Sequence, residues 1–204
     1  MKVLVVYYSL YGHTYALARA VEKGVASIGG VEPVFRRVEE FEAVRNATSD
    51  SKHANALREQ TKDIPVCTVD DLRAADGVVF GSPTRYGNMT AQMKQLIDST
   101  ASLWVKGEME GKPAGVFTST ASTHGGQEST LLTMMVPLLH LGMLIVGLPY
   151  SLPGMIHTEA RGCSPYGAST ISGAKGELTP KPEDLQLAEA LGKRVAEITK
   201  KVRG

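Results

Sequence analysis

The sequence has only two cysteines, Cys67 and Cys163, and one tryptophan among its 204 residues. Two cysteines are too few for the disulfide framework of a small secreted domain, and these two lack the spacing of a metal site. Neither sign of charge predominates, because 22 lysine and arginine residues face 21 aspartate and glutamate residues. A protein devoted to nucleic acid would show a basic excess, so we expect no nucleic-acid partner.

Long hydrophobic runs are also missing. The apolar stretch at residues 3–8 is short and no small-residue cleavage site follows it, which argues against a signal peptide. No window approaches the roughly 20 apolar residues of a membrane span. Together with two reduced thiols, these absences predict a cytoplasmic protein with no integral membrane segment.

Short apolar segments alternate with helical patterns along the chain. Strands are predicted at residues 3–8, 31–38, 76–81, 114–118 and 143–146. Helices are predicted at residues 17–28, 70–75, 89–97, 127–141 and 185–202. This alternation predicts an α/β fold, a doubly wound five-stranded parallel sheet with helices on both faces. Because no repeat or linker is present, we expect a single domain over residues 1–204.

Three segments interrupt this regular pattern. Residues 45–64 are polar and are interpreted as an exposed loop with a short helix. Pro137 is expected to kink or break the helix over residues 127–141. The stretch 147–182 is rich in glycine, proline and serine and is long for a connection, so we expect it to have a functional or interface role.

The first strand leads directly into Ser9-Leu10-Tyr11-Gly12-His13-Thr14 and then into a helix. Free N–H groups at a helix N-terminus bind anions, so this segment is interpreted as a phosphate-binding loop. It lacks both the Gly-x-Gly-x-x-Gly pattern and the lysine of a nucleotide-triphosphatase loop. Without a cation it suits a monophosphate that is held and not transferred. The alternative is an ordinary strand–turn–helix with a hydroxyl cap.

Two more polar, glycine-bearing loops follow strands, at residues 81–89 and 118–128. Since the carboxyl ends of parallel strands share an edge, the three loops are expected to surround one ligand. Hydroxyls, Arg85 and Tyr86 in the second loop and small residues in the third suit a ligand with a phosphate, a polyol and a flat polar ring. FMN fits that description, although turn chemistry explains each later loop taken alone.

These residues resemble the WrbA family of flavodoxin-like NAD(P)H:quinone oxidoreductases. The matching motifs cover nearly the whole chain in order and comprise residues 8–14, 81–89, 103–104, 119–128, 140–143 and 161–168. The strings Pro-Thr-Arg-aromatic-Gly-Asn-Met and Gly-Gly-Gln-Glu are the specific ones. The sequence departs from the family in the length of its segment 121–124 and in Cys163, which stands where glycine is expected.

The resemblance implies a resident FMN held by the three loops. The first loop would hold its phosphate with Ser9, Leu10, Tyr11, Gly12, His13 and Thr14. The second would border the isoalloxazine ring with Pro83, Thr84, Arg85, Tyr86 and Gly87. The third would line the ring and the ribityl chain with Ser119, Thr120, Ala121, Ser122, Thr123, His124 and Gly125. The family assembles as tetramers, and His140 would reach the flavin of a neighbouring subunit.

The implied chemistry is a two-electron reduction of a quinone by NADH or NADPH in ping-pong order. Tyr11, Tyr86 and Trp104 would form an aromatic mouth where both planar substrates stack. His140 would donate a proton to the quinone oxygen, because imidazole titrates near neutral pH. Each of Tyr86, Trp104 and His140 also has a structural reading, as a packed residue without a catalytic role.

Three other functions remain open from the residues. A flavodoxin-like electron-transfer protein is the nearest, although such proteins tend to be strongly acidic. A flavin redox sensor that regulates a protein partner is the second. A thiol enzyme using Cys67 or Cys163 is the third, and neither cysteine lies in a recognisable activated setting.

Overall fold

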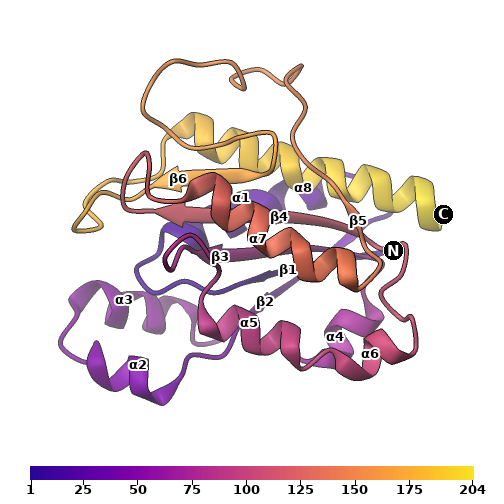
Figure 1. Cartoon of the computed structure of the whole chain (residues 1–204), viewed down its shortest axis with the longest axis horizontal. Coiled ribbons are helices and arrows are strands. Elements are labelled where there is room, and N and C mark those ends of the chain that lie inside the picture. Colours follow the sequence, from indigo (N-terminus) through magenta and orange to yellow (C-terminus); the bar gives the residue numbers. More distant parts are fainter.

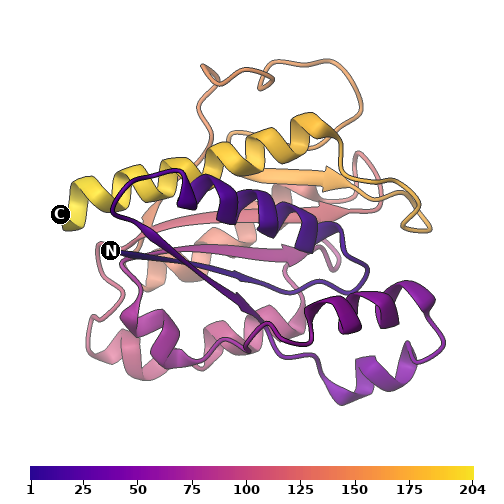
Figure 2. The same ribbon diagram turned by 180° about the vertical axis from the view of Figure 1, so that it is seen from behind.

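The computed structural model describes residues 1–204 and consists of a parallel sheet between two layers of helices (Figures 1 and 2). The strands are β1 (Lys2–Tyr7), β2 (Glu32–Arg37), β3 (Gly77–Pro83), β4 (Pro113–Thr120), β5 (Leu144–Ile145) and β6 (Ala168–Ile171). Their order is β2-β1-β3-β4-β5, and β6 also pairs with β4. The predicted α/β class with a parallel sheet and helices on both faces is therefore confirmed.

The helices are α1 (His13–Ala26), α2 (Glu42–Ala47), α3 (Lys52–Thr61), α4 (Val69–Ala74), α5 (Ala91–Asp98), α6 (Ala101–Val105), α7 (Gln127–His140) and α8 (Pro182–Arg203). Helices α1 and α8 pack on one face of the sheet, and α4 to α7 pack on the other. None of these helices has the length and apolar character needed to cross a membrane.

Alternation of side chains along β1 builds both cores. Val3, Val5 and Tyr7 belong to the cluster under α1 and α8, whereas Leu4 and Val6 belong to the cluster under α4 to α7. Strand residues that are apolar on both faces are typical of a sheet covered on both sides. The polar chemistry is thereby left to the loops at the strand ends.

The fifth position of the sheet is shared by two short strands. β5 pairs with the beginning of β4 at residues 113–114, and β6 pairs with its end at residues 117–120. The prediction of a strand at 143–146 located β5, but β6 was missed inside the stretch 147–182. Its sequence Ala-Ser-Thr-Ile is short and has small residues, so it carries little strand signal.

Two further expectations need correction. Residues 45–64 contain the second half of α2 and the whole of α3, in place of an exposed loop with one short helix. Helix α7 runs through Pro137 and ends only at His140, so of the two expected outcomes, a kink or a break, the break is wrong. Gly142 adopts a left-handed conformation with φ 73°, which is typical of the residue that ends a helix.

Candidate active site

Three loops meet at the carboxyl-terminal edge of the sheet because β1, β3 and β4 are neighbours there. They border a cavity of about 460 Å³. The residues that the loops contribute to its lining are Ser9, Leu10, Tyr11, His13, Thr14, Pro83, Thr84, Arg85, Ser119, Thr120 and Ala121. The structure thus brings nearly the whole of the first predicted loop, and the first half of the other two, to one cavity.

The first loop presents backbone N–H groups at the start of α1. Gly12 is the N-cap and adopts φ 102°, a left-handed conformation that favours glycine. Its N–H donates to Ser9 Oγ at 3.1 Å, which closes the turn. The N–H groups of Tyr11, His13 and Thr14 have no acceptor within the chain. Together with the positive end of the helix dipole, these N–H groups are suited to bind an anion.

Thr14 connects the first loop to the third. Its hydroxyl is buried and lies 2.8 Å from the hydroxyl of Ser119 at the end of β4. Ser119 in turn accepts the N–H of Thr84 on its carbonyl at 2.9 Å. One chain of hydrogen bonds therefore fixes all three loops relative to one another.

The second loop is a tight turn that projects Tyr86 into solvent. Arg85 and Asn88 exchange two backbone hydrogen bonds, of 2.7 and 3.0 Å. Tyr86 and Gly87 between them have φ of 54° and 76°, as in a turn with two left-handed residues. The Tyr86 ring is fully exposed, so it does not pack in the core of this chain. A non-glycine residue in this conformation is strained, which suits a functional position.

The third loop divides between two cavities. Ser119, Thr120 and Ala121 line the cavity of the three loops, whereas Ser122 and Thr123 line a neighbouring one. His124 and Gly125 line neither of these two cavities. The segment 121–124, where the sequence departs from the family, is thus the segment that separates the two cavities.

Sequence reasoning missed two segments that complete the lining. Ser51 and His53 come from the start of α3, and residues 172–176, including Lys175, follow β6. His13 anchors this last segment, because its Nε2 lies 2.9 Å from the carbonyl oxygen of Leu178. Burial lowers the pKa of His13, which favours the neutral ring in this hydrogen bond. The cavity therefore has two cations, Arg85 and Lys175, that the first loop itself lacks.

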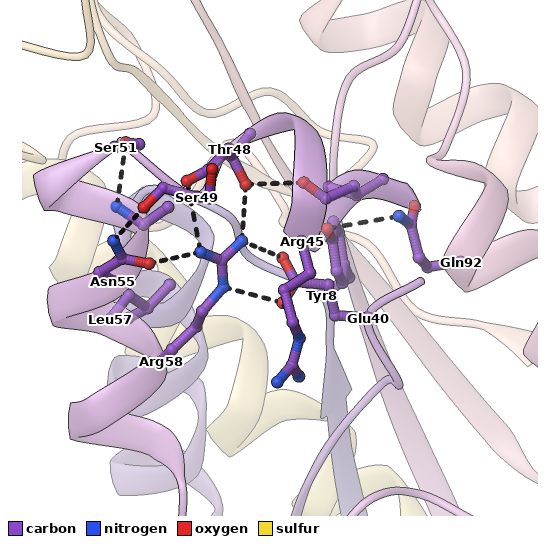
Figure 3. A network of polar contacts seen from close by, with 12 residues as sticks. Tyr8, Glu40, Arg45, Thr48, Ser49, Ser51, Asn55, Leu57, Arg58 and Gln92 are labelled. Atoms are coloured by element: carbon purple, nitrogen blue, oxygen red, sulfur yellow. Dashed lines mark hydrogen bonds and ion pairs between the residues drawn. The ribbon is translucent and has the colours of Figure 1, made fainter. Parts of the chain in front are cut away.

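A network of polar contacts holds α2 and α3 beside the first loop (Figure 3). The Arg58 guanidinium donates to both carboxylate oxygens of Glu40, at 2.9 and 2.8 Å, and to the hydroxyl of Thr48 at 2.6 Å. Gln92 donates to the hydroxyl of Tyr8 at 3.3 Å on the other side of the network. Burial raises the pKa of Tyr8 to about 12, so this phenol stays neutral. The network positions the start of α3, and with it His53.

Trp104 and His140 lie elsewhere on the surface of the chain. They line an apolar groove between α5, α6 and α7, which shares no residue with the cavity of the three loops. The Trp104 side chain is 60% exposed and His140 is also exposed, so neither is a core residue. Val136 and Leu139 on α7 are exposed as well.

Neither cysteine is chemically activated. Burial raises the pKa of both Cys67 and Cys163 to about 12, so each is a neutral thiol at physiological pH. This argues against the thiol-enzyme alternative. Cys163 has φ 74°, in the left-handed region, which explains why glycine is expected at this position.

The cavity fits the chemistry of FMN. The free N–H groups of the first loop suit the phosphate, and the hydroxyls of Ser119 and Thr120 suit the ribityl chain. The lining is polar with few apolar side chains, and Tyr11 and Pro83 offer flat surfaces at its edge. The residues present therefore fit a flavin mononucleotide.

The sheet order and the position of the cavity define a protein of the flavodoxin class. The chain belongs to the NADPH-dependent FMN reductase family, whose model matches residues 1–156. It is 50% identical over the whole of both chains to an NAD(P)H dehydrogenase (quinone) of Geobacter metallireducens. It is 52% identical to one of Syntrophobacter fumaroxidans, with 99% of this chain and 98% of the relative covered.

Solved structures agree on the fold. A flavodoxin, WrbA-like protein of Agrobacterium tumefaciens superimposes with a TM-score of 0.65 at 23% identity, covering 98% of each chain. A flavodoxin from the domain Archaea gives a TM-score of 0.62 at 22% identity, covering 98% of this chain and 99% of the other. The predicted membership of a flavodoxin-like quinone oxidoreductase family is confirmed.

Proposed function

We propose that this chain is an FMN-dependent NAD(P)H:quinone oxidoreductase that reduces quinones by two electrons to hydroquinones. The observation that carries the proposal is the cavity of the three loops, with free N–H groups at the start of α1. The two relatives quoted above, named NAD(P)H dehydrogenase (quinone), support the activity. We place the whole function in one FMN-binding domain over residues 1–204, acting in the cytoplasm.

The cofactor supplies the hydride chemistry, and the chain supplies position and electrostatics. The N–H groups of Tyr11, His13 and Thr14 would hold the phosphate, and Arg85 and Lys175 would add positive charge to the same cavity. Tyr86 does not itself line the cavity, but the strained turn that follows the lining residue Arg85 holds its aromatic ring in solvent. A planar substrate stacks on such a ring without a deep charged pocket.

We propose that NAD(P)H and the quinone bind in turn beside the exposed rings of Tyr11 and Tyr86, in ping-pong order. The support is that both substrates are planar and that Tyr11 and Tyr86 are exposed, at 48% and 106%. Initial rates measured at several fixed quinone concentrations check this order, because ping-pong kinetics give parallel double-reciprocal lines. Intersecting lines would contradict it.

Reduction of the bound flavin tests the function itself. The purified protein, loaded with FMN and kept without air, is expected to lose its visible flavin bands when NADH is added. Addition of benzoquinone is expected to restore them. Bands that ignore NADH would favour the electron-transfer or sensor alternative, and a protein that takes up no FMN would overturn the assignment of the cavity.

We also propose a homotetramer in which Trp104 and His140 of one subunit complete the site of another. The support is that both residues are exposed on a groove that shares no lining residue with the FMN cavity of the same chain. In this arrangement His140 donates the proton to the quinone oxygen and Trp104 stacks on the substrate.

Sedimentation of the purified protein checks the tetramer. The wild-type mass is expected to be that of four chains, and Val136→Lys with Leu139→Lys is expected to give smaller species. Val202→Lys is the matched control, because Val202 is also an exposed apolar residue of a helix but lies on α8. A wild-type monomer would contradict the proposal.

A further inference from the structure

A second cavity, of about 270 Å³, adjoins the FMN cavity. The two share the third loop, since Ala121 lines one and Ser122 lines the other. At the end of β6, Ile171 lines the second cavity and the next residue, Ser172, lines the first. Consecutive residues of the chain therefore line the two cavities at two places, so the cavities lie close together.

Two buried, charged side chains of opposite sign line this second cavity. Arg161 is only 8% exposed and Asp184 only 1%. One terminal nitrogen of Arg161 donates to the carbonyl of Gly154, but its Nη1 is buried without a partner. Asp184 Oδ2 accepts from the hydroxyl of Thr170 at 2.8 Å, but its Oδ1 is buried without a partner.

Unpartnered buried charges are costly, so their presence points to a ligand. No hydrogen bond or ion pair joins Arg161 to Asp184, so neither side chain supplies the hydrogen-bond partner that the other lacks. Arg161 requires an anionic acceptor, and Asp184 requires a hydrogen-bond donor. Burial raises the pKa of Asp184, and the donors Thr170 and Gly162 together with the charges of Arg161 and Lys181 only partly offset this effect.

The start of α8 adds further positive charge to this cavity. Lys181, the N-cap of this helix, lines the cavity with its ammonium group 3.2 Å from the carbonyl oxygen of Ala160. The positive end of the dipole of α8, a helix of 22 residues, lies at the same place. Two cations beside one carboxylate match a phosphate group next to a hydroxyl.

We propose that this second cavity binds the diphosphate of NAD(P)H, with Arg161 and Lys181 on the phosphate oxygens and Asp184 accepting from a ribose hydroxyl. The inference rests on the proposed function, which places the nicotinamide ring at the mouth of the FMN cavity. The dinucleotide is the substrate that carries phosphate and hydroxyl groups side by side, whereas the quinone carries neither. Arg161, Lys181 and Asp184 would thus act on the donor and not on the acceptor.

The test compares two hydride donors in the FMN-loaded enzyme. NADH has the diphosphate, and 1-benzyl-1,4-dihydronicotinamide has the nicotinamide ring without ribose or phosphate. Arg161→Gln is expected to lower the ratio of kcat/KM for NADH to that for the benzyl donor by about tenfold or more, through KM. Asp184→Asn, which keeps the shape of the side chain, is expected to lower the same ratio by a smaller factor.

Arg194→Gln is the matched control, because Arg194 also anchors the segment after β5, through the carbonyl of Gly147, but does not line the cavity. Its donor ratio is expected to equal that of the wild type. Equal losses with both donors in Arg161→Gln, or an unchanged ratio in both Arg161→Gln and Asp184→Asn, would overturn the inference. Failure of the proposed function is a different result, in which the wild type oxidises neither donor.

Discussion

Replacing Ser9 with alanine and Thr14 with valine is expected to weaken FMN binding by about 100-fold, because each hydroxyl orders the phosphate loop. Ser9 Oγ accepts the N–H of Gly12, which sets the left-handed turn. Thr14 is bonded to Ser119, which ties the first loop to the third. Without these two hydrogen bonds, the free N–H groups of the first loop would no longer all point toward the phosphate.

Titration of the apoprotein by flavin fluorescence measures this effect. Riboflavin, which lacks the phosphate, is the comparison ligand, and its affinity is expected to change by less than about fivefold. Thr199→Val is the control for the loss of a buried hydroxyl, because Thr199 Oγ1 has no partner and faces Gly77, outside the cavity of the three loops. Unchanged FMN affinity, or an equal loss for riboflavin, would show that the loop does not recognise the phosphate.

The strands and the loops at their ends could be predicted from local sequence. β1, β3 and β4 are central, and their apolar runs are buried on both faces, which gives a strong signal. The alternation of strands and helices then predicts a parallel sheet, which places the three loops on one edge, whereas the order of the strands came from the structure. The local pattern of apolar residues was therefore sufficient to predict the strands that are buried on both faces.

The parts of the site that the sequence did not predict depend on contacts between segments far apart in the chain. α3 is a polar helix of low hydrophobicity, and its position depends on Arg58 reaching Glu40 and Thr48. Lys175 follows a strand, β6, that forms only because β4 extends past the end of β5. Neither His53 nor Lys175 carries a motif, so nothing in the sequence near them indicates that they line the cavity.

The close packing of α1 on α8 is expected to tolerate no side chain at two glycines. A Cβ at Gly24 would lie 1.9 Å from the carbonyl oxygen of Glu189, and one at Gly192 would lie 2.0 Å from that of Val21. Both clashes are with backbone, which cannot rotate away as a side chain does. Gly24→Ala or Gly192→Ala must therefore separate the two helices, at a cost of about 3 kcal/mol or more in the free energy of unfolding.

Urea unfolding of the apoprotein measures these losses without the stabilisation that bound FMN adds. The double variant is expected to lose less than the sum of the two single losses, because the first substitution already moves the helices apart. Gly29→Ala is the control, since a Cβ there meets nothing within 4 Å, and it is expected to change stability by less than about 0.5 kcal/mol. Single losses below about 1 kcal/mol would contradict the prediction, because they would mean that α1 and α8 can move apart with little loss of stability.

Since α1 carries the phosphate loop at its N-terminus, the same variants are also expected to bind FMN more weakly than Gly29→Ala does.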